Sequence, residues 1–204
     1  AFKNRIINGA CAINQRSSSL ATTNTQGYYV DRMWGFSSVI SATFSQGSSS
    51  GLTGFPYFAR AQRNSGQAAG SIYTGQIVES NNLQDLQGQS VSISFWARAG
   101  ANYSPTSSAL VVYLRTGTTA DQGLNTLVSG WAGAVDQTST VTLTTSWQKF
   151  TVTTFTVASN AQELTVFFNA NGTGTAGAND YFDVTGIQLE KGSTATSFDY
   201  RPYG

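Results

Sequence analysis

The fold is decided by the stretch Val91-Ser92-Ile93-Ser94-Phe95-Trp96-Ala97-Arg98, in which apolar and polar side chains alternate at nearly every position. Successive side chains of an extended strand point to opposite faces of a sheet. The pattern therefore predicts a strand over 91–98 with one face in a core and the other turned away from it. The core set is Val91, Ile93, Phe95 and Ala97, and the opposite set is Ser92, Ser94, Trp96 and Arg98.

Similar strand patterns recur on both sides of this stretch, separated by loops rich in Gly, Ser, Thr and Asn. Helical periodicity is nearly absent, and Asn81–Gln87 is the one segment that favours a helical turn. Short strands between such loops predict an all-β fold, a two-sheet antiparallel β-sandwich. No composition shift or repeat marks a boundary, so we expect one domain over residues 1–204. The expected strands are Arg5–Ile13, Tyr28–Phe44 with a break near Ser37-Ser38, Tyr57–Gln62, Ser71–Glu79, Ser90–Ala99, Ala109–Arg115, Thr138–Thr144, Trp147–Val157, Glu163–Asn169, Asp180–Leu189 and Ser197–Arg201.

Two strands carry a change of phase. In the last long strand Phe182 and Val184 share a face, but after Thr185-Gly186 the apolar positions become Ile187 and Leu189. A one-residue shift at a glycine predicts a β-bulge. The apolar phase also slips between Val152 and Phe155, which predicts a second bulge.

The composition limits the function classes that fit this chain. Charged residues make up 10% of the 204 residues, and the formal net charge is +1. The Lys and Arg residues are scattered, so no nucleic-acid-binding surface is predicted. No apolar stretch approaches the ~20 residues that span a bilayer, so membrane insertion is not expected either.

Histidine is missing from the sequence, and there is a single cysteine, Cys11. These counts exclude Ser-His-Asp and Cys-His catalytic arrangements and thiolate metal clusters. Cys11 lies between two alanines in an expected strand, so we interpret it as a packed residue. A carboxylate pair of the glycosidase type is the catalytic arrangement that remains, and no pair of acids in the sequence favours it strongly. We therefore expect a protein that is not an enzyme.

Several segments together resemble a known family. The C-terminal stretch, YFDVTGIQLEKGSTATSFDYRPYG over 181–204, resembles the closing signature of carbohydrate-binding-module-like jelly-roll domains in tailed-phage virion proteins. The N-terminal segments Asn4–Ala10, Ile13–Arg16 and Tyr28–Arg32 resemble the same family, as does Ser92–Arg98 in the centre. The resemblance covers essentially the whole chain.

This resemblance implies a jelly roll at a tail-fibre tip or on a capsid surface. The first hypothesis is a non-enzymatic virion protein, assembled in the host cytoplasm, whose partners are a host surface glycan and other virion proteins. The alternative is a capsid decoration, cement or head-fibre protein with a mainly structural role. The lack of an attachment domain before Asn4 or a segment after Gly204 would favour that alternative. A glycosidase or depolymerase is the third hypothesis.

Glycan binding directs attention to aromatic and planar polar side chains. Aromatic rings stack on the apolar faces of sugars, while Arg, Asn, Gln and Asp bond vicinal hydroxyls. For Trp96, packing under a covering loop is an equal alternative, and for Trp131 the alternatives are loop anchoring and subunit contact. The candidate ligand-binding residues are Trp96, Arg98, Tyr103, Tyr113, Arg115 and Trp131.

Two acids, Asp180 and Asp183, stand close together at the start of the last long strand. Three interpretations are open: a solvated strand entry hydrogen-bonded to a neighbouring loop, a structural calcium site, or a catalytic pair. Related domains often hold calcium partly through an acid near the chain start. In the matching segment Asn8–Cys11 no acid follows Gly9, which weakens that carry-over.

We also expect a homo-oligomer, most simply a trimer, because the resembled proteins commonly follow three-fold axes. Linked copies would gain avidity for weakly bound sugars. The candidate subunit contacts are apolar residues near the ends and turns: Phe2, Phe55 and Tyr203. Packing of these residues onto their own domain is the alternative.

Overall fold

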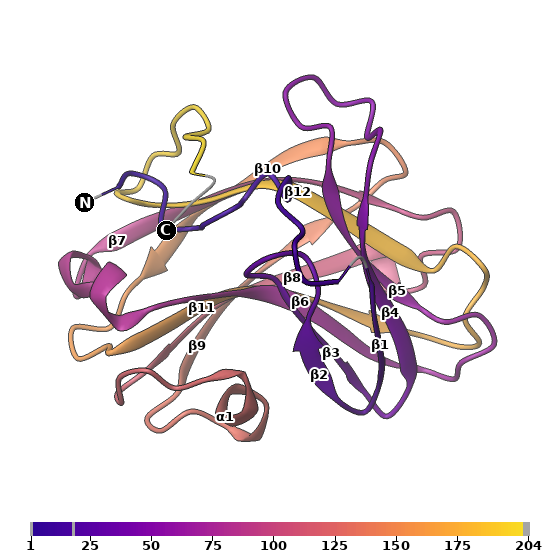
Figure 1. Ribbon diagram of the computed structural model, residues 1–204, viewed down its shortest axis with the longest axis horizontal. Coiled ribbons are helices and arrows are strands. Elements are labelled where there is room, and N and C mark those ends of the chain that lie inside the picture. Colours follow the sequence, from indigo (N-terminus) through magenta and orange to yellow (C-terminus); the bar gives the residue numbers. More distant parts are fainter. Residues whose placement is uncertain (1, 18, 202–204) are drawn as a thin grey trace.

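The computed structural model describes residues 2–17 and 19–201, which form two antiparallel sheets of six strands packed face to face (Figure 1). We name each sheet by its edge strands. The β1–β10 sheet has the order β1 (Ser19–Thr23), β4 (Ser41–Gly47), β5 (Phe58–Arg63), β12 (Tyr181–Lys191), β7 (Ser90–Ala99) and β10 (Gln148–Thr156). The β2–β9 sheet has the order β2 (Gln26–Tyr28), β3 (Trp34–Ser38), β6 (Gly70–Val78), β11 (Glu163–Gly172), β8 (Ala109–Gly117) and β9 (Val135–Thr142).

The last eight strands are wound as a jelly roll. The chain alternates between the sheets in nested antiparallel pairs, β5 with β12, β6 with β11, β7 with β10 and β8 with β9. The first four strands repeat the nesting on a smaller scale, because β1 pairs with β4 and β2 with β3. The predicted all-β sandwich with jelly-roll topology is confirmed.

Alternation along the strands builds the core between the sheets. Val91, Ile93, Phe95 and Ala97 are buried in it, as the pattern predicted. Burial of this many Val, Ile, Leu and Phe side chains supplies the main free energy of folding, at about 25 cal/mol per Å² of apolar surface. Both predicted bulges are present: the β10–β7 register shifts between Val152 and Phe155, and the β12–β7 register shifts between Thr185 and Gln188.

The N-terminal segment corrects one strand prediction. Residues 5–13 form turns and irregular chain, with left-handed φ values of 57° at Asn8 and 56° at Cys11. Its backbone still finds partners, because Arg5 N donates to Leu189 O (2.9 Å) and Ile187 N donates to Gly9 O (2.9 Å). The segment therefore follows β12 without joining the sheet. Cys11 is buried as predicted, and desolvation raises the pKa of its thiol to about 12.

Residues 197–201 likewise form no strand. The expected helical turn at 81–87 is present as two 3₁₀ turns, Ser80–Asn82 and Gln84–Leu86, and a third lies at Thr106–Ser108. One helix was not predicted, α1 (Leu124–Ser129). No helix among the described residues has the length and apolar character needed to cross a bilayer.

Candidate functional site

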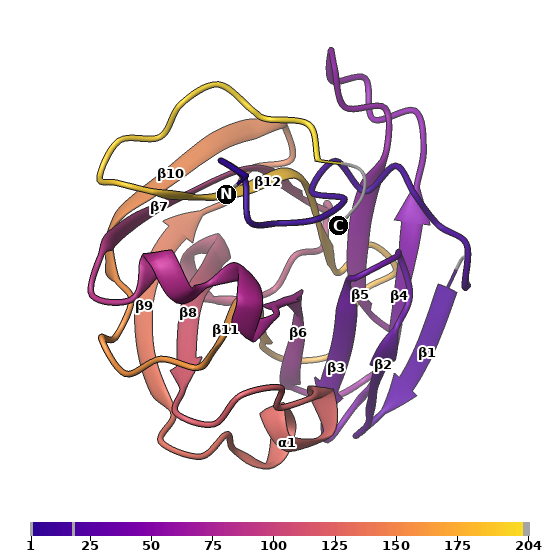
Figure 2. The same ribbon diagram turned by 60° about the vertical axis from the view of Figure 1, so that its left-hand side comes forward.

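The outer faces of the two sheets differ in how they are covered. On the β1–β10 sheet, Ser92, Ser94, Gln188 and Glu190 point away from the core yet are buried. Segments near both chain ends lie over this face; for example, Thr196 N donates to the Glu190 carboxylate (3.0 Å). Figure 2 shows these segments crossing outside β7, β10 and β12. This face is therefore largely closed.

The β2–β9 sheet carries a row of aromatic rings on its outer face. Phe36 of β3 stands directly opposite Tyr73 of β6, with ring centroids 5.5 Å apart. Phe167 of β11 stands opposite Tyr113 of β8, and these two rings stack at 4.4 Å. Tyr73 and Phe167 are themselves 6.4 Å apart, so the row runs across four neighbouring strands.

A glycine brings Trp34 into this row. Gly75 of β6 pairs with Trp34 on one side and with Phe167 on the other. A Cβ at Gly75 would overlap Phe167, so the missing side chain lets the two rings approach to 5.6 Å across the strand. A glycine weakens a strand, but at position 75 it makes room for the aromatic cluster.

The segment around α1 covers part of the row. Figure 1 shows α1 outside the β2–β9 sheet, on the side away from the β1–β10 sheet. Leu124, Leu127 and Trp131 of this segment pack with Trp34 and Phe167 in a second apolar cluster. The helix is short because glycines bound it, and Gly130 ends it with φ 112°.

A cleft of about 150 Å³ remains between α1 and the sheet. It lies at the edge of α1, where the helix no longer covers the aromatic row. We call it the aromatic cleft, and it is lined by Trp34, Phe36, Tyr73, Arg115, Leu127, Val128 and Phe167.

The cleft also contains polar groups with unused hydrogen-bonding capacity. Trp34 Nε1 is buried and has no hydrogen-bond partner among the described residues. Arg115 is oriented by Asp136, which accepts from Nε (2.6 Å) and Nη2 (2.7 Å), and by Leu127 O, which accepts from Nη1 (3.1 Å). These contacts raise the pKa of Arg115, chiefly through the hydrogen bond to Asp136. The cleft therefore offers aromatic surfaces together with fixed donors.

One of the six predicted glycan residues lines the cleft, and two more pack beside it. Arg115 lines the cleft, Tyr113 stacks on its Phe167, and Trp131 anchors the covering segment. Trp131 is 3% exposed and donates through Nε1 to Gly123 O (3.2 Å). That placement corresponds to the loop-anchoring alternative. Sequence reasoning missed Trp34, Phe36, Tyr73 and Phe167; their signal was an aromatic at the outward position of three strands.

The other three predicted residues lie elsewhere. Trp96 is half-buried on the outer face of the β1–β10 sheet, and both it and Phe55 border Gly186. Arg98 lies on the same face, over the Trp147 ring at 4.7 Å. Tyr103 packs against the core and donates to Ala109 O (2.8 Å).

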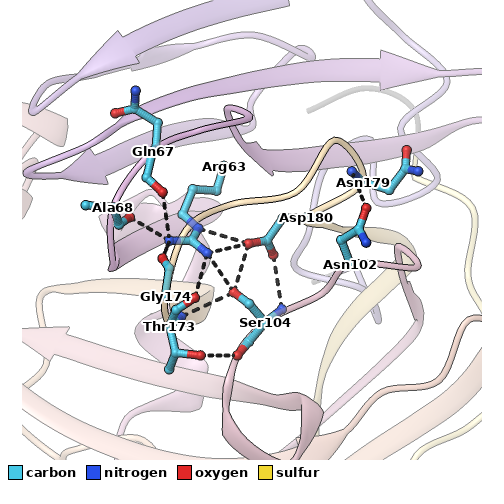
Figure 3. Close-up of polar contacts among 9 residues, drawn as sticks. All are labelled: Arg63, Gln67, Ala68, Asn102, Ser104, Thr173, Gly174, Asn179 and Asp180. Carbon is cyan, nitrogen blue, oxygen red and sulfur yellow. Dashed lines mark hydrogen bonds and ion pairs between the residues drawn. The ribbon is translucent and has the colours of Figure 1, made fainter.

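Asp180 is held by a buried arginine (Figure 3). Arg63, 1% exposed, donates to the Asp180 carboxylate from Nε (2.9 Å) and Nη2 (2.7 Å). The same guanidinium donates to the carbonyls of Ala68, Thr173 and Gly174 (2.5, 2.9 and 2.8 Å). A carboxylate with loop carbonyls is the donor set that calcium favours, and here that set surrounds a guanidinium.

Asp183 is likewise paired, on the outer face of β12. It accepts from Arg60 Nε (2.7 Å) on β5 and from Arg98 Nε (2.8 Å) on β7. The two acids therefore enter separate arginine networks, and the described residues contain no group of three or more His, Cys, Asp or Glu that could hold a metal ion. Calcium binding stays a prediction. The expected solvated strand entry is wrong, because Asp180 and Asp183 are both buried, although Asp180 does accept from Ser104 N of a neighbouring loop (3.2 Å).

The candidate subunit contacts are placed in part. Phe2 is 60% exposed and lies under the Arg201 guanidinium, 4.4 Å from the ring centroid. Phe55 is half-buried and meets Phe198 edge-on at 4.9 Å. Tyr203 lies outside the described residues.

Comparisons with known proteins identify the fold. No protein-family model and no curated protein sequence matches the chain. Among solved structures, the enzymatically active domain of bacteriophage CBA120 tailspike protein 4 matches with a TM-score of 0.57 and 12% identity. The match covers 92% of this chain but 21% of that one, so this chain corresponds to a small part of the tailspike structure.

Two further matches span whole structures. A putative sugar binding protein from Bacteroides thetaiotaomicron matches with a TM-score of 0.50 and 12% identity, over 93% of this chain and 100% of that one. The carbohydrate-binding module TmCBM61, solved with β-1,4-galactotriose, matches with a TM-score of 0.49 and 11% identity, over 93% and 99%. At these identities the likeness concerns the fold.

Proposed function

We propose that this chain is a carbohydrate-binding domain of a phage virion surface protein, and that the aromatic cleft recognises a host cell-surface sugar without cleaving it. The observation that carries the proposal is the outward aromatic row beside fixed donors. Sugar rings present apolar C–H faces for stacking and hydroxyls for bonding, and the cleft supplies a partner for each.

The fold and the sequence support the same proposal. The chain shares its fold with a putative sugar binding protein and with part of a phage tailspike. The sequence resemblance to virion jelly rolls adds the phage context. Binding without catalysis agrees with the lack of histidine and with the engagement of Asp180 and Asp183 in arginine pairs.

A glycan array followed by calorimetry tests the cleft. We expect Phe36→Ala and Tyr73→Ala each to weaken sugar binding by roughly tenfold, which corresponds to about 1.4 kcal/mol. Tyr57→Ala is the matched control, because Tyr57 is 37% exposed and adjoins β5 in the other sheet. Binding that both cleft variants leave unchanged would refute this site.

The virion role is tested separately by electron microscopy of phage particles labelled at this chain. Label at the tail tip supports a receptor-binding role, whereas label over the shell supports the capsid-decoration alternative. A particle without label contradicts both.

A further inference from the structure

A second and larger depression lies on the other side of α1. It is a groove of about 590 Å³, which we call the polar groove. Gln122 and Gly123, just before α1, form part of its wall, whereas Leu127 and Val128 within α1 line the aromatic cleft. The segment around α1 thus separates two depressions on one sheet face. The residues that line the polar groove are Arg16, Tyr28, Asp31, Arg32, Ile77, Glu79, Asp121, Gln122, Gly123 and Glu163.

The charged side chains of the polar groove keep unused hydrogen-bonding capacity. Asp31 Oδ1 accepts a hydrogen bond from Gln15 N (2.9 Å), and Glu79 Oε1 accepts one from Arg32 Nη1 (2.6 Å). The second carboxylate oxygen of each makes no hydrogen bond in the described part of the chain. Arg16, which is exposed, likewise has no hydrogen bond or ion pair to those residues. Donors and acceptors therefore both remain available to a ligand.

Glu163 and Asp121 meet through one serine. Ser80 Oγ lies 3.2 Å from Glu163 Oε2 and 3.1 Å from Asp121 Oδ1, and it accepts from Asp121 N (3.0 Å). A hydroxyl has one proton to donate, so Ser80 can serve only one of two ionised carboxylates at a time. Glu163 Oε2 also accepts from Gln122 N (3.2 Å). A protonated Glu163 could donate to Ser80 while Ser80 donates to Asp121, and burial raises the pKa of Glu163 to about 7.

The mixed charge of the polar groove limits the class of ligand. Asp31, Glu79 and Asp121 would repel a polyanion, and Arg16 and Arg32 offset most of the attraction that these acids would have for a polycation. A neutral polyhydroxylated molecule can use the carboxylate oxygens as acceptors and the guanidinium groups as donors. Tyr28, 41% exposed, and Ile77 beside it supply an apolar surface for a sugar face.

We infer that the polar groove is a second binding site, separate from the aromatic cleft, and that it takes a neutral oligosaccharide. Tyr28 provides the stacking surface. Arg16, Asp31 and Glu79 bond the hydroxyls. A chain with two separated sugar sites would bind one polysaccharide at two points and gain avidity without a second copy of the protein.

The experiment measures binding by calorimetric titration of the intact chain. The ligands are neutral tetrasaccharides of the gluco, manno, galacto and N-acetylglucosamino series. The groove variants are Arg16→Ala and Tyr28→Ala, which alter exposed side chains. Asp31→Asn is a finer variant, because it keeps the Oδ1 acceptor for Gln15 N and changes the free oxygen. We expect each to weaken binding of at least one tetrasaccharide by fivefold or more, and Tyr73→Ala to leave that binding unchanged.

Three outcomes would overturn the inference. One is that no neutral tetrasaccharide binds at millimolar concentration. Another is that binding is lost in Tyr73→Ala and retained in all three groove variants, which would assign the sugar to the aromatic cleft. The third is that oligogalacturonate or oligolysine binds in a manner that Arg16→Ala or Asp31→Asn abolishes, because the ligand would then be charged.

Discussion

Arg63 is the residue on which several loops near one end of the sandwich depend. Its guanidinium joins the Asp180 carboxylate, the Ser104 hydroxyl (2.9 Å) and carbonyls from the segments 67–68 and 173–174. An isolated buried charge is costly, whereas a pair with all its hydrogen bonds satisfied is tolerated. The network therefore stabilises the structure only while both partners are present.

We expect Arg63→Met to lower the free energy of unfolding by about 3–5 kcal/mol, because Asp180 would be left buried and unpaired. Urea denaturation measures the change, with exposed Arg16→Met as the control. The double variant Arg63→Met/Asp180→Leu should recover part of the loss. A single variant within 1 kcal/mol of the unaltered protein would contradict this assignment, and a midpoint lowered by a chelator would instead support the calcium prediction.

Glu163 makes stability depend on pH. Burial raises its pKa from 4.5 to about 7, so the folded state binds more protons than the unfolded state between these values. This contribution to stability is full below pH 4.5 and is lost as the pH rises through about 7. At 1.36 kcal/mol per pKa unit the full shift corresponds to about 3.4 kcal/mol, and solvent screening lowers the expected loss to the order of 2 kcal/mol.

Glu163→Gln should remove that dependence, so the variant becomes more stable than the unaltered protein at pH 8. Urea midpoints from pH 4 to pH 8 measure the difference between the two. Glu79→Gln, which changes an exposed acid of the same groove, is the control. Parallel pH profiles for Glu163→Gln and the unaltered protein would disprove this role for Glu163.

At the scale of elements, the bulge in β12 connects the core to the face above it. Gly186 has φ 60°, and a Cβ there would lie 3.0 Å from Phe55 and 3.1 Å from Trp96. The bulge restores Ile187 and Leu189 to the core after the phase change. A glycine is needed at this position both for its backbone conformation and for space.

We expect Gly186→Ala to destabilise the fold by about 1–3 kcal/mol. Gly51→Ala is the matched control, since Gly51 has φ 75° but no atom lies within 4 Å of the added Cβ. The difference between the two thermal midpoints isolates crowding from backbone strain. Equal shifts in both variants would mean that crowding against Phe55 and Trp96 contributes nothing.

At the scale of the whole molecule, both depressions open on the outer face of the β2–β9 sheet. The homotrimer stays a prediction. We expect sedimentation velocity across a concentration series to give a species three times the 21.6 kDa chain mass. Phe2→Ser is the test variant, because Phe2 is exposed and stands near the chain ends. A species that stays at the mass of one chain at tens of micromolar would exclude a trimer of the isolated chain.

The sequence by itself determined the sandwich. Alternation over 90–99 and the phase change at Gly186 are local signals, because the pleat and the bulge depend on neighbouring residues alone. The resemblance at both chain ends extended this to the jelly roll. The strand predicted at 5–13 was wrong. Its apolar residues resemble those of a strand, but the segment forms turns that hydrogen-bond to β12.

Only the tertiary structure decided which residues meet. Trp34, Phe36, Tyr73 and Phe167 are far apart in the chain, and β3, β6 and β11 bring them together through nested pairing. The partners of Asp180 and Asp183 are arginines more than 80 residues away in sequence. Spacing along a strand shows which face of the sheet a side chain takes, but the order of the strands decides its neighbours. Because a jelly roll pairs strands that are far apart in the chain, no local stretch of sequence indicates that order.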